Sequence, residues 1–384
     1  MPEIRFAKNA AELKRWNHFV LSHAGTSFFA TSHWLDSYRA FGMKTHYLIA
    51  EDANQMLVGG AALAEFRMGP FMWLDILHGP VVAQGDVELI NQLLDAIEVY
   101  AQTHKAMVVQ ISPFEPSHDH DQIAAQATTY GLSYVPDLLA EADCGIASKL
   151  AARGYGHTIV IRVFVRHATH GQIVDLAQED LLMSFRKGTR RDIRYAMDSG
   201  VIVDKVETIT GLERAYSIMR ENATQQSYSI RPWETFKIAV WPAIQANDAV
   251  VLLAKYEEQP IATVVVLFGG RRGAYVMGGT RRLGLEKVYP AHYLQHVAML
   301  ETCARGYVHY DLTSIGTGGV ADFKRGFRPA YYELVGTYSK VYQPHRLRLF
   351  LRIEPQLRKN RRRIARLTYF AKNVLNRKRG RVMQ

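Results

Sequence analysis

Residues 310–327 concentrate the groups of this chain that could handle a negative charge. Asp311 stands at the end of a predicted strand, a glycine-rich turn follows at 316–319, and Lys324 comes next, beside Phe323. Free backbone N–H groups and a cation near one strand end suit a phosphate or a developing oxyanion. A carboxylate there is a candidate general base. The alternatives are a solvated turn for Lys324, and a turn cap or an arginine partner for Asp311.

A second cationic group lies on a helix predicted over 179–199. Arg190 and Arg194 are four residues apart, so they share one face of that helix and could hold one anion together. The alternative is an ordinary charged helix face on which these arginines pair with Asp192 or Asp198. The sequence does not decide between the two.

Three tyrosines in the same half of the chain are candidates to hydrogen-bond a substrate, namely Tyr275, Tyr289 and Tyr293. Each of them, taken singly, fits a core position better.

A metal site is not predicted. His118 and His120 fall on one side of an extended chain, but no third ligand accompanies them, and the chain's two cysteines stand alone.

Alternating helical and strand patterns surround these residues and predict an α/β layer fold. In the first part of the chain we expect helices at 11–22 and 87–104 and strands at 47–50, 57–64, 71–77 and 106–111. The second part has helices at 179–199, 211–226, 233–246 and 291–305 and strands at 157–165, 250–256, 261–268, 273–277 and 307–312. Two units with a similar order of elements follow from this pattern.

The length of 384 residues also favours two domains, and the small-residue stretch at 140–152 is the predicted link between them.

The basic charge of the protein is confined to its C-terminal segment. Residues 345–384 contain 14 of the 47 Lys and Arg but one of the 36 Asp and Glu, so that segment carries +13 and the rest −2. We expect strand-like or irregular chain over 341–353 and a basic amphipathic helix from Glu354-Pro355 onward.

Several of these segments together resemble the Fem-type (FemABX) peptidoglycan-branching aminoacyltransferases. The resemblance rests on Tyr310-Asp311-Leu312, Phe323-Lys324-x-x-Phe327, Tyr289-x-x-x-Tyr293, Tyr332-Glu333-Leu334-Val335-Gly336, and Ser184-Phe185-x-Lys187-x-Thr189-Arg190 with Arg194. It spans about 25–345, strongly in the second unit. It implies two tandem GNAT-like (acyl-CoA N-acyltransferase-like) domains plus the C-terminal basic helix. The domains would comprise 1–152, completed by 337–350, and 153–336, followed by the tail 351–384.

The resemblance also implies an activity and roles. Members transfer an amino acid from aminoacyl-tRNA to an amino group on the peptide of a lipid-linked or nucleotide-linked cell-wall precursor, without a further cofactor. The family's Phe-Lys pair falls on Phe323 and Lys324, at the transfer site or tRNA end, and its arginine helix falls on Arg190 and Arg194, near precursor phosphates. Where the family often has a phosphate-binding Lys this chain has Tyr38, and Arg39 beside it is the candidate substrate ligand.

Two other functions stay open at this point. Arg281-Arg282-Leu283-Gly284-Leu285 partly matches the pyrophosphate loop of acyl-CoA-dependent N-acyltransferases acting on a sugar, lipid or antibiotic, but Glu286 replaces its last glycine. The basic tail suits a non-catalytic protein that binds membrane or RNA. Without a secretory signal or an apolar run long enough to cross a bilayer, we expect a cytoplasmic protein, with 351–384 placing it on the inner face of the plasma membrane.

Overall fold

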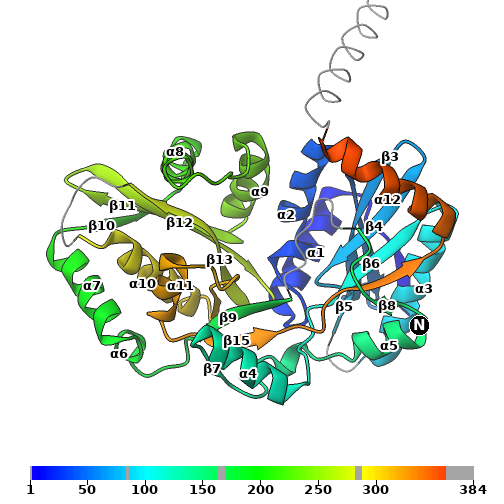
Figure 1. The fold of residues 1–384 in the computed structure, drawn as a ribbon, viewed down its shortest axis with the longest axis horizontal. Coiled ribbons are helices and arrows are strands. Elements are labelled where there is room, and N and C mark those ends of the chain that lie inside the picture. The colour runs from blue at the N-terminus through cyan, green and yellow to red at the C-terminus, as the bar shows by residue number, and fades with distance from the viewer. Residues whose placement is uncertain (1, 84–85, 162–168, 282–287, 360–384) are drawn as a thin grey trace, which may run out of the picture.

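The computed structural model describes residues 2–83, 86–161, 169–281 and 288–359. Two eight-stranded sheets, each covered by helices on both faces, lie side by side (Figure 1). None of the helices in these ranges combines the length and hydrophobicity that a bilayer span requires.

The first sheet has the order β1-β2-β3-β4-β6-β16-β8, with β5 paired to β3. Its strands are β1 (Glu3–Phe6), β2 (Lys44–Glu51), β3 (Leu57–Met68), β4 (Phe71–Leu77), β5 (Val81–Val82), β6 (Val108–Ser112), β8 (Gly156–His157) and β16 (Tyr338–Val341). Helices α1 (Ala10–Ser22) and α12 (Pro344–Lys359) pack on one face, and α3 (Val87–Thr103) and α5 (Ile146–Ala152) on the other. Short helices η1 (Phe28–Ala30), α2 (Ser32–Leu35) and η2 (Asp36–Phe41) join α1 to β2.

The second sheet has the order β10-β11-β12-β13-β14-β9-β15-β7. Its strands are β7 (Ser133–Tyr134), β9 (His170–Asp175), β10 (Ile202–Lys205), β11 (Ala249–Tyr256), β12 (Gln259–Gly269), β13 (Arg272–Thr280), β14 (His309–Asp311) and β15 (Ala330–Glu333). Helices α7 (Lys187–Asp198) and α10 (Pro290–Cys303) cover one face, and α8 (Ile209–Gln225) and α9 (Trp233–Gln245) the other. Shorter helices are η3 (Ala140–Ala142), α4 (His120–Tyr130), α6 (Leu181–Ser184) and α11 (Gly319–Arg325).

The predicted α/β class and most elements of both series are present, although the two sheets exchange strands. Of the strand predicted over 157–165, only the start lies in a strand, β8, and 162–165 lie outside the described residues. Strand β16, near the end of the chain, pairs with β6 and β8 in the first sheet. Strand β7, from the segment assigned to the first domain, pairs with β15 at the edge of the second sheet. The domain limit at residue 152 stays a prediction.

The prediction for the start of the last helix is wrong. Helix α12 begins at Pro344, ten residues before Glu354, and Pro355 lies inside it. The apolar residues Leu347, Leu349 and Leu351 alternate with arginines, which is typical of a strand, but Leu347 and Phe350 are three residues apart and both are buried. A helix places that pair on one face, against the first sheet. The continuation over 360–384 lies outside the described residues.

The helix predicted over 179–199 is also divided. Helix α6 ends at Ser184 and α7 begins at Lys187, because Phe185 takes an extended conformation and is completely buried in the core of the second sheet. The break turns α7 relative to α6. It leaves the last carbonyl groups of α6 without partners inside their own helix.

The two units meet through closely packed backbone. A Cβ atom on Gly269 would lie 2.3 Å from the Phe28 nitrogen, and one on Gly270 would lie 2.0 Å from the Thr26 oxygen. His33 reaches across to Asp248 at 3.0 Å. The side chain of Trp34, from the first unit, is buried in the core of the second. The two units therefore share a core.

Candidate active site

The candidate site begins where two neighbouring strands separate. Strand β13 pairs with β14 in parallel only over 272–274, and then continues to Thr280 paired with β12 alone. A bulge in β13, where Val265 and Val266 of β12 face Met277 and Tyr275, lies at the point of separation. Because a bulge bends a strand, the second half of β13 turns away from β14.

Lys324, on helix α11, is bound to the loop that follows β14, next to this separation. Its side chain is only 3% exposed, and Nζ donates hydrogen bonds to the carbonyl oxygens of Leu312, at 2.8 Å, and Ser314. An ammonium has three N–H donors, so one has no partner among the described residues. Burial lowers the pKa of Lys324 to about 8, although Asp311 opposes the shift. The cation is therefore held by the loop that follows β14.

Tyr275 and Thr313 lie close to Lys324. The ammonium lies 5.8 Å from the centre of the Tyr275 ring, and Thr313 Oγ1 donates to the Tyr275 carbonyl oxygen at 3.1 Å. Burial raises the pKa of Tyr275 to about 12, so its hydroxyl stays protonated near neutral pH. This phenol can donate a hydrogen bond to a substrate.

An aromatic group stands beside Lys324, on the side of α10. The ring of Phe323 lies 4.8 Å from His292 and 5.4 Å from Phe327. His292 in turn lies near Tyr289, which starts α10 and stacks on Tyr195 of α7 at 6.2 Å. Tyr293 is half-buried against the same core. The predicted residues Phe323, Tyr289 and Tyr293 thus surround one region.

Asp311 belongs to a polar row that crosses the other face of the sheet. Its carboxylate accepts hydrogen bonds from the Thr313 backbone at 2.6 Å and from Tyr332 Oη at 3.0 Å. Burial raises the pKa of Asp311, while the Arg272 guanidinium opposes that rise. Arg272 donates to the Thr26 carbonyl and covers the Phe114 ring at 3.6 Å. These contacts attach the end of β14 to the first unit, and the general-base role of Asp311 stays a prediction.

The arginines of α7 do not converge on one position. Arg190 donates to the carbonyl oxygens of Met183, at 2.8 Å, and Phe185, at 3.0 Å, and so satisfies the end of α6. Arg194 is exposed and touches the Met183 sulfur at 3.9 Å. The role of this pair in holding precursor phosphates stays a prediction. Arg190 also stabilises the junction of α6 and α7 through its hydrogen bonds to these carbonyl oxygens.

Arg39 is also occupied. It donates from Nε to Thr45 Oγ1 at 2.7 Å and pairs with Asp36 at 3.1 Å. A cation that the sequence analysis missed stands nearby. The Arg231 guanidinium lies 4.3 Å from the Trp34 ring and 5.3 Å from the Tyr38 ring, and one of its buried terminal nitrogens has no hydrogen-bond partner in the part of the chain that the structure describes.

Arg231 is placed by the loop between α8 and α9, which also carries Tyr228 close to the Tyr275 side of β13. Burial lowers the pKa of Arg231. An unpartnered guanidinium nitrogen between two aromatic rings is suited to an anionic group of a ligand. Tyr38 and Arg231 are separated by almost 200 residues, and no local sequence pattern reveals their pairing.

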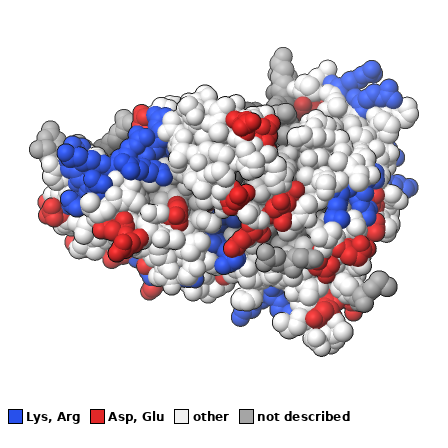
Figure 2. Space-filling view, turned by 90° about the horizontal axis from the view of Figure 1, so that it is seen from below, with Lys and Arg blue, Asp and Glu red and all other residues white. Residues whose placement is uncertain are grey.

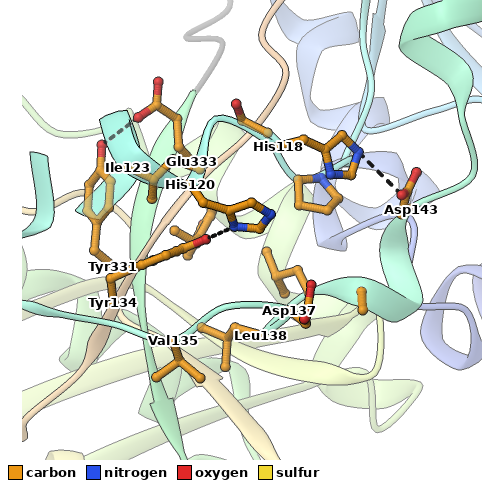
Figure 3. A pocket seen from close by; sticks show the side chains of 15 residues that line it. His118, His120, Ile123, Tyr134, Val135, Asp137, Leu138, Asp143, Tyr331 and Glu333 are labelled. Atoms are coloured by element: carbon orange, nitrogen blue, oxygen red, sulfur yellow. Dashed lines mark hydrogen bonds and ion pairs between the residues drawn. The ribbon is translucent and has the colours of Figure 1, made fainter. Parts of the chain in front are cut away.

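A pocket of about 90 Å³ that is partly open to solvent lies elsewhere, between α4 and the edge of the second sheet (Figure 3). It contains the two histidines considered as metal ligands, which have separate partners. His118 pairs with Asp143 at 3.3 Å, while His120 is hydrogen-bonded to Tyr134 Oη. In the described part of the chain, no three His, Cys, Asp or Glu side chains are arranged to hold a metal ion.

The segment 281–285, which partly matches a pyrophosphate loop, lies almost wholly outside the described residues.

Comparison with known proteins agrees with this geometry. The two sheets and the separation of β13 from β14 define a tandem GNAT-like fold. An acetyltransferase (GNAT) domain model matches residues 183–325, and the FemAB family model matches residues 12–238. The chain therefore belongs to the FemAB family and is an aminoacyltransferase of the FemABX type. Substrates of this family are, in general, aminoacyl-tRNA and peptidoglycan precursors.

Solved structures support the fold. The crystal structure of FemX has a TM-score of 0.73 and 16% sequence identity, over 91% of this chain and 100% of that one. The C-terminal domain of a putative lysylphosphatidylglycerol synthetase from Agrobacterium fabrum has a TM-score of 0.53 and 13% identity, over 91% of this chain and 98% of that one. No curated protein matches the sequence significantly.

Proposed function

We propose that this protein transfers an amino acid from aminoacyl-tRNA to the amino group of a lipid-linked peptidoglycan precursor, at the opening between β13 and β14. The observation that carries this proposal is Lys324, a buried cation beside the point where β13 leaves β14, with one N–H that has no partner among the described residues. A preorganised charge in a site that excludes water stabilises a developing oxyanion far better than one in water.

The reaction needs no metal or covalent nucleophile. The precursor amine attacks the ester carbonyl carbon, a C–N bond forms, and the C–O bond to the tRNA ribose breaks. The amine loses a proton and the ribose oxygen gains one. The ester is already activated, so positioning of the two substrates and stabilisation of the oxyanion supply the catalysis.

The roles we assign follow the contacts. Lys324 stabilises the oxyanion or the leaving ribose oxygen, and Phe323 shapes the pocket beside it together with His292. Tyr275 offers its protonated hydroxyl to a substrate. Tyr289 and Tyr293 line the approach along α10. Asp311 positions the end of β14 from the opposite face, through Thr313.

The acceptor enters, in this proposal, from the junction of the two units. Arg231 has an unpartnered nitrogen there, between Trp34 and Tyr38. A precursor phosphate would supply the missing acceptor atom, with the bidentate geometry that arginine favours. Arg39 and Arg194 are the more exposed candidates for the same substrate.

The C-terminal segment supports a lipid-linked acceptor over a nucleotide-linked one, and in this proposal the protein works on the inner face of the plasma membrane. Helix α12 is anchored by Phe350 but presents Leu349, 52% exposed, and Leu351, 44% exposed, next to Arg348 and Arg352. Exposed apolar side chains among cations suit the surface of an anionic membrane, and residues 345–384 add a net charge of +13.

One assay tests the proposal. Purified protein is incubated with labelled aminoacyl-tRNAs and with lipid-linked, nucleotide-linked and soluble precursors. Ribonuclease is added to one arm, and acyl-CoA replaces the tRNA in another. We expect transfer that ribonuclease abolishes and that is fastest with the lipid-linked acceptor. Transfer from acyl-CoA that resists ribonuclease would establish the alternative donor instead.

A further inference from the structure

Lys324 is held differently from the cations at the surface. Figure 2 shows groups of lysines and arginines at both ends of one face of the molecule, where water can surround them. The Lys324 side chain is only 3% exposed, and its ammonium is bound to the carbonyl oxygens of Leu312, at 2.8 Å, and Ser314. A buried ammonium takes its position from the groups to which it donates. A residue that fixes these carbonyl groups therefore positions the cation.

Gln172, on β9, is bound to this part of the chain. Its side chain is completely buried, and Nε2 donates to the carbonyl oxygens of Ser314, at 3.1 Å, and Ile315, at 3.3 Å. The carboxamide and the Lys324 ammonium thus donate to the same oxygen atom of Ser314. The Gln172 backbone oxygen also accepts a hydrogen bond from the Leu312 nitrogen at 2.8 Å. Gln172 therefore contacts both residues whose carbonyl groups hold Lys324.

The loop that Gln172 contacts contains a strained residue. Thr313 has a φ of 59°, in the left-handed region that a β-branched residue rarely adopts. It lies between Leu312 and Ser314, the two residues that accept hydrogen bonds from Lys324. Such a conformation persists only where the surrounding structure holds it in place. The Gln172 carboxamide supplies two of the hydrogen bonds that do so.

The Gln172 side chain is not optimal for stability. Its Oε1 atom is buried and has no hydrogen-bond partner within the described ranges, and an unpaired buried acceptor costs free energy. Turning the amide over would not remove this cost, because Oε1 would then face two carbonyl oxygens. An apolar side chain of the same size would avoid it. A buried polar group that breaks this rule beside a proposed oxyanion donor is typical of a functional position.

We propose that Gln172 is a positioning residue for the transfer reaction. Its carboxamide fixes the Ser314 carbonyl group and, through it, holds the Lys324 ammonium at the ester oxygen. This role rests on the proposed function, in which Lys324 stabilises the oxyanion. A donor that is already in place needs no reorganisation during the reaction. Loss of the carboxamide would let the ammonium move with the loop, so the effect should fall on kcat and not on substrate binding.

A double-mutant cycle tests whether Gln172 acts through Lys324. Gln172→Met has nearly the same volume but donates no hydrogen bond. We expect this change to lower kcat about tenfold and to leave KM for both substrates unchanged. In the Lys324→Met background it should lower kcat by less than about twofold, because the group that it positions is absent. Equal factors in the two backgrounds would overturn the proposal.

The matched control is Gln110→Met, the same change at a completely buried glutamine of the first sheet. Gln110 uses both ends of its carboxamide, since it accepts from the Val160 and Ile161 nitrogens and donates to Asp75 and the Ile161 carbonyl oxygen. Gln110→Met should therefore lower the melting temperature more than Gln172→Met does. At saturating substrates it should nevertheless keep kcat within about twofold of the wild type. If kcat followed the melting temperature in both variants, the proposal would be overturned.

A titration tests the contact without any substrate. Lysine-specific ¹³C NMR follows the Lys324 signal, which is assigned by its absence in Lys324→Met. Gln172→Glu places a carboxylate beside the oxygen that the ammonium shares, so the midpoint of this titration should rise by about one pH unit or more. Two ionisable neighbours of Lys324 in the described part of the chain, Asp311 and Tyr275, are unaltered in this variant. An unchanged midpoint would contradict the proposed contact.

Gln172→Asn provides a further variant if the others do not fold. It keeps a buried carboxamide but is one carbon too short to reach Ser314, so kcat should fall as in Gln172→Met, and a wild-type kcat would overturn the proposal. The outcomes also separate the two proposals. If the wild type transfers from aminoacyl-tRNA and the Gln172 variants match its kcat, the positioning role is overturned and the function stands. If the wild type transfers only from acyl-CoA, the proposed function fails, and the same cycle run with that donor decides the role of Gln172.

Discussion

The Lys324 ammonium lies 5.8 Å from the centre of the Tyr275 ring, across the opening where β13 leaves β14. Tyr275 belongs to β13, whereas Lys324 belongs to helix α11 and is held by the loop that follows β14. At this distance the ammonium lies within cation–π range of the ring. The ring therefore neighbours the group that, in the proposed reaction, donates to the ester oxygen.

We predict that Lys324→Ala lowers kcat about 100-fold or more, the range typical of a lost oxyanion donor, while the protein stays folded. Arg325→Ala, one residue along the same helix, is the control. Arg325 pairs with Asp322 and the Tyr130 carbonyl and points away from the opening. Initial rates under saturating donor and acceptor, together with melting curves, measure both. Full activity of Lys324→Ala would remove this residue from the site.

The activity should fall as the pH rises through about 8. The pKa of Lys324 is lowered to about 8 by burial, so the ammonium is charged below this pH and neutral above it. The cation, and with it the stabilised oxyanion, is lost on the alkaline side. Rates are measured from pH 6 to 9.5, corrected for spontaneous hydrolysis of the ester. The residual activity of Lys324→Met should lack this alkaline limb, and persistence of the limb would assign it to another group.

Arg231→Gln should raise KM for the precursor roughly 10- to 100-fold, the effect expected when one charged hydrogen bond to a phosphate is lost. KM for the donor should not change. Arg220→Gln, an exposed cation on α8, provides the comparison and should leave both constants unaltered. If Arg231→Gln changed only KM for the donor, the acceptor would have to bind elsewhere.

Gly171→Ala should destabilise the protein by roughly 1–3 kcal/mol, the usual penalty for overpacking. A Cβ atom at this position would lie 2.5 Å from Tyr332 Oη, which crosses Gly171 to reach Asp311. Gly188→Ala, with nothing within 4 Å of its added atom, should be neutral or stabilising. Urea denaturation gives both values. In a Tyr332→Leu background, which lacks the large side chain, Gly171→Ala should lower the free energy of unfolding by much less.

A chain ending at Lys359 should keep the melting temperature of the full protein, whereas one ending at Gln343 should lose several degrees or fail to fold. The difference is Phe350, which is completely buried and lies 5.4 Å from Trp73 and 5.5 Å from Phe71. Loss of a buried phenylalanine typically costs about 3–5 kcal/mol. Equal melting temperatures for the two truncated chains would contradict this anchoring role.

Local patterns in the sequence predicted most elements and the family. The start of α12 was missed because Leu347, Leu349 and Leu351 recur at every second position, as in a strand. The structure shows the helical period instead, because Phe350 is buried together with Leu347, three residues away. For the site, motif residues predicted Lys324 and Phe323. Arg231 could not be found in this way, because its rings belong to Trp34 and Tyr38, far away in sequence. Contacts between distant segments follow from tertiary packing, which periodicity does not encode.

Strand β16 lies between β6 and β8, so the inner strands of the first sheet are complete only when residues 338–341 have been added. During synthesis on the ribosome, this edge of β6 therefore stays unpaired until residues 338–341 have been made. An exposed strand edge invites association with other chains. Nascent chains interrupted within the second half are therefore the species most in need of a chaperone.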